Sequence, residues 1–297
     1  MTPAIQQDLE RLAADARSGA SELLPRAVAV LQRARAEDPT DVPAVARAVA
    51  HAQPAMAPLW NAALAALGEE GDPGALDRFE QRWRRAGDAL VREAGPVLAR
   101  ADGAAPLVAT WSFSRTVLGC LVGFGRRQAL TVACAEGRPA CEGRRLALEL
   151  AGAGIAVEFF TDGGLSGVFD RPGRTPDAVL VGADAVAPEW IINKCGTRML
   201  AAAAAAAGVP VYVAATRDKF VDTPVAALLR VESRDPAEVW GGAPAGVSVR
   251  NAYFERVPLA LVSGVITDVG LLGGDMVAEA CRAASARVPP GAIEWLG

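Results

Sequence analysis

From residue 103 onward the chain alternates short apolar runs with amphipathic stretches, and this alternation limits its fold more than any other feature of the sequence. The apolar runs have the length of strands, whereas the stretches between them have helical periodicity. The predicted strands are 106–110, 129–134, 155–160, 178–184 and 209–215, and the predicted helices are 114–123, 141–152 and 196–207. Strands that alternate with helices at this spacing form βαβ units and a parallel sheet, so an open α/β domain is expected.

The first 100 residues have a different hydrophobic pattern, because they show helical periodicity throughout and contain no strand-like run. Leu76, Phe79 and Trp83, for example, recur at the three- and four-residue spacing of a packed helix face. We therefore predict a helical N-terminal domain at 1–102. A Rossmann-like α/β ligand-binding domain with a mainly parallel sheet is predicted at 103–297.

Composition and charge exclude several classes of protein. The chain has 297 residues, of which 52% are hydrophobic, so it can bury a sizeable core and is not disordered. Its formal net charge of -4 argues against a nucleic-acid partner, which requires a clustered basic surface. No apolar run approaches the roughly 18 residues that span a membrane, and the charged N-terminus lacks an apolar signal core. A cytoplasmic protein without a membrane partner is expected.

Cysteine, histidine and glycine patterns exclude several kinds of site. The five cysteines include no CxxC pair, which argues against a disulfide framework and a structural zinc site. His51 is the single histidine, so a metal centre built from several imidazoles is not expected. No GxGxxG run follows the first predicted strand, and no P-loop of the GxxxxGK type is present. We therefore expect neither a metal nor a cofactor.

Polar residues follow the predicted strands at the positions where ligand crevices form in open α/β sheets. Asn193 and Lys194 precede a Gly-Thr pair that begins a predicted helix, and exposed amides at a helix start favour a phosphate. Ordinary loop polarity or helix capping explains each of these residues taken alone, but the whole set at successive strand ends favours a ligand site. The set consists of Ser112, Arg138, Asp184, Asn193 and Lys194.

Several segments of the chain, among them QPAMAPLWN at 53–61, resemble one protein family. The run GADAVAPEWIINKCGTRMLAAAAAAAGVPVYVAATRDKF at 182–220 is similar to the signature of the translation initiation factor 2B α/β/δ-subunit family. EGRPACEGRRLALELAGAGIAVEFFTD at 136–162, ATWSFSRTVL at 109–118 and NAYFERVP at 251–258 resemble other segments of that family. SGASELLPRAVAVL at 18–31 resembles the helical domain of its prokaryotic members. The family also contains methylthioribose-1-phosphate isomerase and ribose-1,5-bisphosphate isomerase, and the chain is identified as a prokaryotic-type member.

The resemblance implies roles for individual residues. Asp184 falls on the aspartate of the GAD motif, which is held to carry out proton or hydride chemistry in the sugar-phosphate isomerases of the family. Asn193 and Lys194 fall on a pair that contacts the substrate. Arg138 falls on the arginine of a segment that offers a candidate phosphate ligand.

Two positions depart from the family pattern. Gly19 and Ala20 correspond to an N-terminal phosphate loop, but Ser18 stands where the methylthioribose enzyme has an arginine. The isomerases carry a His-Cys pair after the first strand, whereas this chain has Trp-Ser, with Ser112 in the place of the catalytic cysteine. A serine hydroxyl has a far higher pKa than a thiol and needs a partner base for proton transfer. Cys195, the thiol nearest to the set in sequence, is interpreted as a packing residue.

Two functions of different classes therefore remain open. The first is an aldose-1-phosphate to ketose isomerase that uses Asp184, with Ser112 as the second catalytic residue. The second is a non-catalytic, initiation-factor-2B-like regulatory or assembly protein that binds a sugar phosphate or a nucleotide. A phosphorylated small molecule is the expected partner under both hypotheses, whereas Ser112 favours the second.

The resemblance also implies self-association. Members of the family associate through the α/β domain, so a homodimer or a higher homo-oligomer is expected. The segment 257–269 is rich in apolar residues and is interpreted as surplus to a single core. It is therefore a candidate for the surface that joins two copies.

Overall fold

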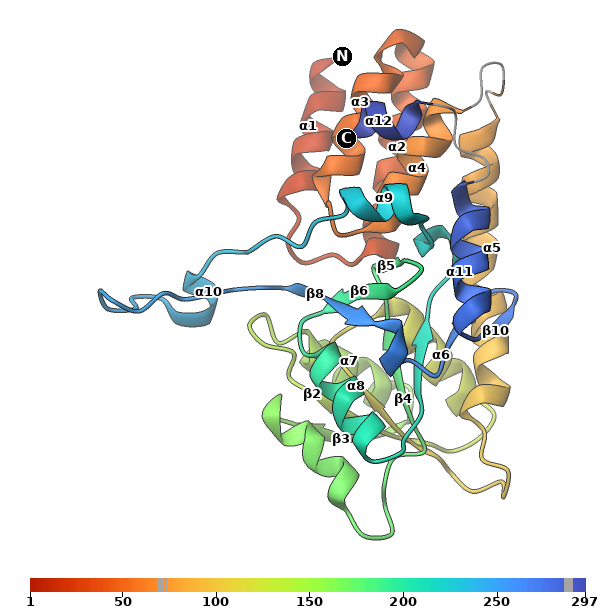
Figure 1. The fold of residues 1–297 in the computed structure, drawn as a ribbon, viewed down its shortest axis with the longest axis vertical. Coiled ribbons are helices and arrows are strands. Elements are labelled where there is room, and N and C mark those ends of the chain that lie inside the picture. The colour runs from red at the N-terminus through yellow and green to blue at the C-terminus, as the bar shows by residue number, and fades with distance from the viewer. Residues whose placement is uncertain (69–71, 73, 286–290) are drawn as a thin grey trace.

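The computed structural model describes residues 1–68, 72, 74–285 and 291–297. The chain begins with a bundle of helices and continues into a sheet-containing region, which lies below the bundle in Figure 1. The helices of the bundle are α1 (Pro3–Ala14), α2 (Ala20–Glu37), α3 (Val42–Ala52), α4 (Ala57–Leu67) and α5 (Ala75–Leu98), with the 3-10 turn η1 (Pro39–Asp41) between α2 and α3.

The helix α4 lies at the centre of the bundle because its sequence, APLWNAALAAL, is apolar on nearly every side. Leu59 and Trp60 are completely buried, and α4 contacts α2, α3 and α5. The long helix α5 joins this bundle to the sheet. Its first turns place Phe79 in the core of the bundle, whereas its later turns place Leu90 against α6 and the sheet.

The main sheet of the described chain has seven strands in the order β10-β9-β7-β4-β1-β2-β3. All neighbouring strands pair in parallel except β10, which is antiparallel to β9. The strands are β1 (Leu107–Thr110), β2 (Thr131–Ala135), β3 (Ala156–Phe160), β4 (Ala178–Gly182), β7 (Val211–Ala214), β9 (Gly264–Thr267) and β10 (Gly270–Leu272). Every residue of β1, β4 and β9 is buried, as expected for parallel strands that are covered on both faces.

Helices cover both faces of this sheet. On one face α5 packs with α6 (Arg115–Gly125) and α7 (Glu142–Gly152), and on the other lie α8 (Thr197–Ala206), α11 (Gly274–Ser285) and the 3-10 segment η2 (Gly163–Asp170). Three layers result, with helices on either side of the sheet. Because the strands are parallel, their carboxyl ends meet at one edge, and this edge faces the helical bundle.

A smaller sheet and several short elements surround that edge. The strands β5 (Ala185–Val186), β6 (Trp190–Lys194) and β8 (Phe254–Pro258) form an antiparallel sheet in the order β5-β6-β8. The remaining elements are η3 (Arg217–Lys219), α9 (Thr223–Leu228), α10 (Ala237–Trp240), η4 (Leu259–Leu261) and α12 (Ala292–Leu296). The last of these returns to the bundle, where the carbonyl of Leu296 lies 2.7 Å from Nε2 of His51.

The predicted fold class is confirmed. Each predicted strand and helix of the α/β region is present, with ends shifted by a few residues. The division at 102 stays a prediction, since α12 packs beside α3 although it follows the sheet. The interpretation of 257–269 as surplus apolar surface is wrong for its strands, because Val257, Val265 and Ile266 are buried in the core of the chain itself.

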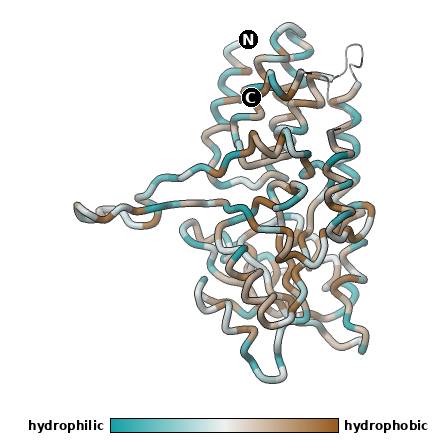
Figure 2. The backbone as a smooth tube through the Cα atoms, in the orientation of Figure 1, coloured by the Kyte–Doolittle hydropathy of each residue, from teal (hydrophilic) through white to brown (hydrophobic). Residues whose placement is uncertain are grey.

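One segment projects away from the rest of the molecule. Residues 230–253, here called the arm, extend to the left in Figure 1 as two extended stretches joined through α10. In Figure 2 the arm is mostly hydrophilic along its length, with hydrophobic residues near its end. Val239, Trp240 and Val247 are 42%, 53% and 47% exposed. The arm is nevertheless ordered by its own hydrogen bonds, such as that from the amide of Asn251 to the carboxylate of Glu238 at 2.8 Å.

Candidate functional site

Asp184 lies at the carboxyl edge of the main sheet, in the link between β4 and β5. Its backbone is held on two sides. The N–H of Asp184 donates to the carbonyl of Ile192 at 2.7 Å, and its own carbonyl accepts from the N–H of Ala57 at 2.9 Å. The first residue of α4 is therefore bonded directly to the edge of the sheet, and the position from which the carboxyl group projects is fixed.

Positive groups from three distant parts of the chain surround the carboxyl group of Asp184. The backbone N–H of Ala20 donates to it, and the ammonium groups of Lys219 and Lys194 attract it. Burial raises the pKa of Asp184, and these three positive groups reduce that rise without cancelling it. A carboxyl group with a raised pKa keeps its proton at higher pH and can therefore act as an acid.

Gly19 and Ala20 form the start of α2, with Gly19 as its N-terminal cap. Glu22 holds this start in place, because its Oε2 accepts from the N–H of Gly19 at 3.3 Å while its Oε1 pairs with Arg115 and Arg145. The amides and the dipole at the start of a helix attract anions. The helix start that approaches the sheet edge is thus the one predicted as a phosphate loop.

Asn193 and Lys194 end β6 and are only 7% and 6% exposed. The ammonium group of Lys194 donates to Oε1 of Glu142 at 2.6 Å and lies 3.9 Å from the ring centre of Tyr253. The amide of Asn193 donates to the hydroxyl of Thr197 at 2.9 Å. The charge of Lys194 is therefore already shared with a carboxylate, whose other oxygen, Oε2, is buried without a hydrogen-bond partner in the described chain.

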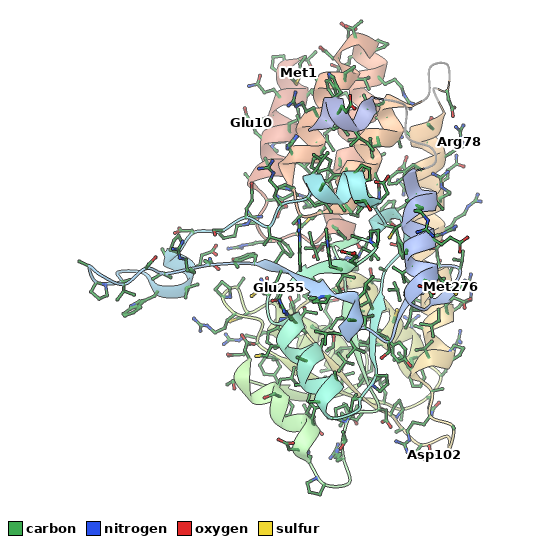
Figure 3. The ribbon with its side chains drawn as sticks, viewed as in Figure 1. Met1, Glu10, Arg78, Asp102, Glu255 and Met276 are labelled. Carbon is green, nitrogen blue, oxygen red and sulfur yellow. The ribbon has the colours of Figure 1, made fainter. Side chains whose placement is uncertain are left out.

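The helix start after Lys194 is not an open anion site. The N–H groups of Gly196 and Arg198 both donate to Oε1 of Glu255, at 2.8 and 2.9 Å. Glu255, labelled in Figure 3, comes from β8. The prediction that these amides receive a phosphate is wrong, because a carboxylate of the chain already occupies the favourable position for an anion.

Ser112 is buried and has a φ of 60°, a conformation that is uncommon for a residue other than glycine. It lies against Gly137, where an added Cβ would stand 3.5 Å from the Cα of Ser112. The indole N–H of Trp111 donates to the carbonyl of Cys195 at 2.8 Å, and its ring covers Gly196 so closely that a Cβ there would stand 2.2 Å away. Trp111 is thus a packing residue. The hydroxyl of Ser112 makes no hydrogen bond within the described residues.

Two other predicted positions lie outside the group around Asp184. The side chain of Arg138 is exposed and makes no hydrogen bond or ion pair with the described part of the chain. Its backbone N–H donates to Oδ2 of Asp162 at 2.8 Å, which fixes the loop after β2. Ser18 donates its hydroxyl to Oδ2 of Asp15 at 2.8 Å and closes the turn before α2.

Lys219 belongs to the group around Asp184, although no motif in the sequence pointed to it. It ends η3, is 4% exposed, and forms no hydrogen bond or ion pair with any residue that the structure describes. The composition of the chain could have pointed to Lys219, because only two of the 30 basic residues are lysines, Lys194 and Lys219. Both are buried beside the same carboxyl group, which indicates a need for a compact ammonium group that arginine does not meet.

Four of the five cysteines cannot replace the thiol that is missing at Ser112. Burial raises the pKa of Cys120, Cys134 and Cys281 to about 12, and it also raises the pKa of Cys195. These four thiols therefore stay protonated at neutral pH, and a protonated thiol is a poor nucleophile and a poor base.

The candidate site consists of carboxyl, ammonium, hydroxyl and backbone amide groups. Among the described residues, no three His, Cys, Asp or Glu side chains gather in a way that suits a metal ion. None of the helices in the described chain is both long and apolar enough to cross a membrane.

The chain is similar to proteins of one family along most of its length. The model of the initiation factor 2 subunit family matches residues 88–274. The methylthioribose-1-phosphate isomerase of Gemmatimonas aurantiaca is 36% identical over 189 residues, which cover 63% of this chain and 54% of that protein. The enzyme of the same name from Syntrophotalea carbinolica is 32% identical over 209 residues, which cover 68% of this chain and 60% of that protein. The chain thus spans little more than half the length of these relatives.

The fold has a counterpart among solved structures. The translation initiation factor eIF-2B of Pyrococcus horikoshii OT3 superposes with a TM-score of 0.78, covering 93% of this chain and 100% of that one. The two sequences are 24% identical, so this likeness concerns the fold alone.

Proposed function

Because this chain belongs to the initiation factor 2 subunit family, we propose that the group of residues around Asp184 binds a phosphorylated sugar. The observation that carries the proposal is Lys219, which is 4% exposed and has no hydrogen-bonded carboxylate in the described chain. The nearby carboxyl groups of Asp184 and Asp218 attract this ammonium group, but neither is hydrogen-bonded to it in the described chain, so its N–H donors can serve a ligand that brings the opposite charge. A phosphate group supplies both that charge and several acceptor oxygens.

The surrounding groups suit this ligand. The start of α2 at Gly19 and Ala20 offers backbone amides, and Lys194 adds a second ammonium group that is already held by Glu142. The guanidinium of Arg138, which is exposed and makes no ion pair with the described residues, remains our proposal for a further phosphate contact. A phosphate bound between Lys219 and α2 would place the sugar ring beside the carboxyl group of Asp184.

We further propose that Asp184 acts as the acid of an aldose–ketose isomerisation, the reaction named for the relatives. An aldose 1-phosphate has a blocked anomeric oxygen, so its ring opens only when a proton is delivered to the ring oxygen. A carboxyl group whose pKa is raised by burial can deliver that proton. A hydrogen then moves from C2 to C1 while the C2 hydroxyl gives up its proton, so the isomerisation as a whole neither consumes nor produces protons. Ser112 is the proposed second group.

A second candidate function has an observation in its favour. Ser112 stands where the isomerases have a cysteine, and its hydroxyl has no base to activate it among the described residues. The same site could therefore bind a sugar phosphate or a nucleotide without converting it. In that case the chain would be a regulatory or assembly protein of the initiation-factor-2B type, and catalysis would have been lost with the thiol.

We propose that the chain forms a homodimer or a higher homo-oligomer and acts in the cytoplasm. The arm supports the first part, because it exposes Trp240 and two valines on a projecting segment that is ordered in advance. The residues where the arm joins the rest of the molecule also contact the candidate site. The hydroxyl of Tyr253 donates to Glu238 of the arm at 2.7 Å, and the ring of Tyr253 lies against the ammonium group of Lys194. A sedimentation experiment on the purified chain tests this proposal, and a monomer at micromolar concentration would contradict it.

A thermal-shift screen with a matched set of variants tests the ligand proposal. Ribose 1,5-bisphosphate, methylthioribose 1-phosphate, AMP and GMP are compared, and a ligand at 100 times its dissociation constant should stabilise the fold by about 2.7 kcal/mol. Lys219→Met should remove this gain, whereas Lys219→Arg keeps the charge and tests the need for an ammonium group. A flat response of the wild type to all four ligands would overturn the proposal. Product analysis with the best ligand then separates the isomerase from the non-catalytic candidate.

A further inference from the structure

A cavity of about 500 Å³ opens between α4, α5, α11 and the turn that joins β9 to β10. This volume falls within the range of small-molecule sites, about 300–1,000 Å³. The cavity contains none of the residues assigned above to the candidate site, although Asp218 in its wall precedes Lys219 directly in η3. Met276 of α11, labelled in Figure 3, is among its lining residues and is 54% exposed.

The walls of the cavity are mainly apolar and partly aromatic. Phe79 and Trp83 line it from α5, and Phe220 and Leu272 line it from the side of the sheet. The wall at η3 is rigid, because the side-chain amide of Asn61 donates to the backbone carbonyls of both Asp218 and Phe220, at 2.6 and 2.9 Å. Such a cavity is formed before any ligand arrives, which favours binding of a compact apolar body.

The charges in the cavity do not cancel. Arg217 pairs with Asp268 at 2.7 Å, and Arg82 is engaged in an interaction of its own. Glu279, by contrast, is exposed on α11 without a hydrogen bond or ion pair to the described residues. Asp218 also lacks a cation bonded to it, and its Oδ1 has no hydrogen-bond partner within the described chain. Glu279 therefore lines a largely apolar space without a bonded positive group in the described chain, and Asp218 adds a second carboxyl group to the wall, where Lys219 attracts it without bonding to it.

We propose that this cavity binds a small organic cation, an aromatic or alicyclic body that carries one protonated amine. The apolar body would fill the space beside Phe79 and Trp83, and an aromatic face such as that of Trp83 also attracts a cation. The ammonium group would lie between Asp218 and Glu279. The last side-chain torsion of an aspartate is broad and roughly two-fold, so a modest rotation can turn an oxygen of Asp218 toward the amine. This proposal does not depend on the site around Asp184.

Calorimetric titration of the purified full chain with 2-phenylethylamine and with its neutral isostere, 2-phenylethanol, tests the proposal. The amine should bind at least about tenfold more tightly than the alcohol, because charge-assisted hydrogen bonds are roughly twice as strong as neutral ones. Glu279→Gln and Asp218→Asn should each weaken binding of the amine about fivefold, with little effect on the alcohol. Glu10→Gln on α1 is the matched control, since Glu10 is exposed and far from the cavity (Figure 3).

Three results would overturn the proposal. The first is the absence of amine binding up to about 10 mM, which corresponds to a free energy too small for a built site. The second is equal binding of the amine and the alcohol, which would show that charge plays no part. The third is a Glu279→Gln variant that binds the amine as the wild type does. Because Glu279 is exposed, this variant should fold even if Asp218→Asn does not.

Discussion

Asp184 and Asp218 share one lysine and differ in what else surrounds them. Burial raises the pKa of both carboxyl groups, and the charge of Lys219 lowers both. Around Asp184 the chain adds two more positive groups, Lys194 and the N–H of Ala20. Around Asp218 it adds apolar walls and the hydroxyl of Thr216.

The difference shows that a raised pKa does not by itself identify a catalytic acid. Burial alone produces it at both positions, so the neighbouring groups decide what each carboxyl group can do. The two ammonium groups and the start of α2 beside Asp184 suit an anionic ligand whose reaction needs a proton. Glu279, which lines the same cavity as Asp218 and has no bonded cation among the described residues, suits a cation instead. The predictions below separate these two surroundings, beginning with the largest expected effect.

Replacing Asp184 with asparagine should lower turnover of a sugar phosphate by about 100-fold or more, because general acid catalysis typically contributes that much. The substitution keeps the shape of the side chain and removes its ionisable proton. Binding of the sugar phosphate, measured by calorimetry, should stay within about fivefold of the wild type, since the lysines remain in place.

Asp218→Asn is the matched control for this experiment. It should change turnover by less than about fivefold, because Asp218 lines the separate cavity and Lys219 stays in place beside Asp184. Equal losses in the two variants would contradict the distinction between the two carboxyl groups. Turnover that is absent from the wild type would instead decide for the non-catalytic candidate.

Replacing Lys219 with methionine should weaken ligand binding at the site around Asp184 and strengthen it in the cavity beside Asp218. Loss of a charge-assisted contact should weaken sugar-phosphate binding about tenfold or more. The amine probe should bind about twofold more tightly, because the variant lacks a cation that repels the probe near Asp218. Two calorimetric titrations on one protein preparation measure both effects. A loss of both affinities would indicate a general structural defect, which thermal unfolding of the free variant would reveal.

Much of the fold could be predicted from the sequence because local periodicity determines it. The alternation after residue 103 gave the parallel strands, and the helical spacing before it gave the bundle. The small sheet was not predicted. The strand β5 has two residues and β8 is only partly buried, so neither shows the alternation of hydrophobic residues that marks a strand in a sequence. The pairing of β6 with β8 across 59 intervening positions depends on tertiary contacts that short patterns do not encode.

The candidate site was predicted where a motif and a strand end coincided, as at Asp184 and Lys194. Lys219 was missed because it lies in a 3-10 turn without a motif, and only the scarcity of lysine in the chain marks it. The anion site expected at Gly196 failed for a related reason. Its amides are capped by Glu255, a residue 59 positions away that no local pattern links to them.

Replacing Ser112 with cysteine affects only the region of Asp184 and should raise sugar-phosphate turnover above the wild type by about tenfold. A thiolate is accessible near neutral pH, whereas an alkoxide is not. The left-handed backbone at Ser112 is kept by the substitution, because both side chains have similar size. Product formation measured from pH 6 to 9 should increase with pH as the thiol ionises. An unchanged rate would indicate that the position is not the second catalytic group.

The smallest expected effect is on the free energy of unfolding. Asparagine at either position should change it in the same direction, by a different amount. A group whose pKa is raised by folding holds its proton more tightly in the folded state, so its contribution to the free energy of unfolding falls as pH rises through that pKa. Asp218→Asn should therefore gain stability relative to the wild type as pH rises above about 4, the ordinary aspartate pKa, by about 1.4 kcal/mol for each unit by which folding raises the pKa of Asp218. Asp184→Asn should gain less, because two lysines rather than one compensate the Asp184 charge, and Asp268 adds repulsion at Asp218. Urea unfolding of the wild type and both variants at several pH values measures these differences, and a larger gain for Asp184→Asn would reverse our ranking of the two surroundings.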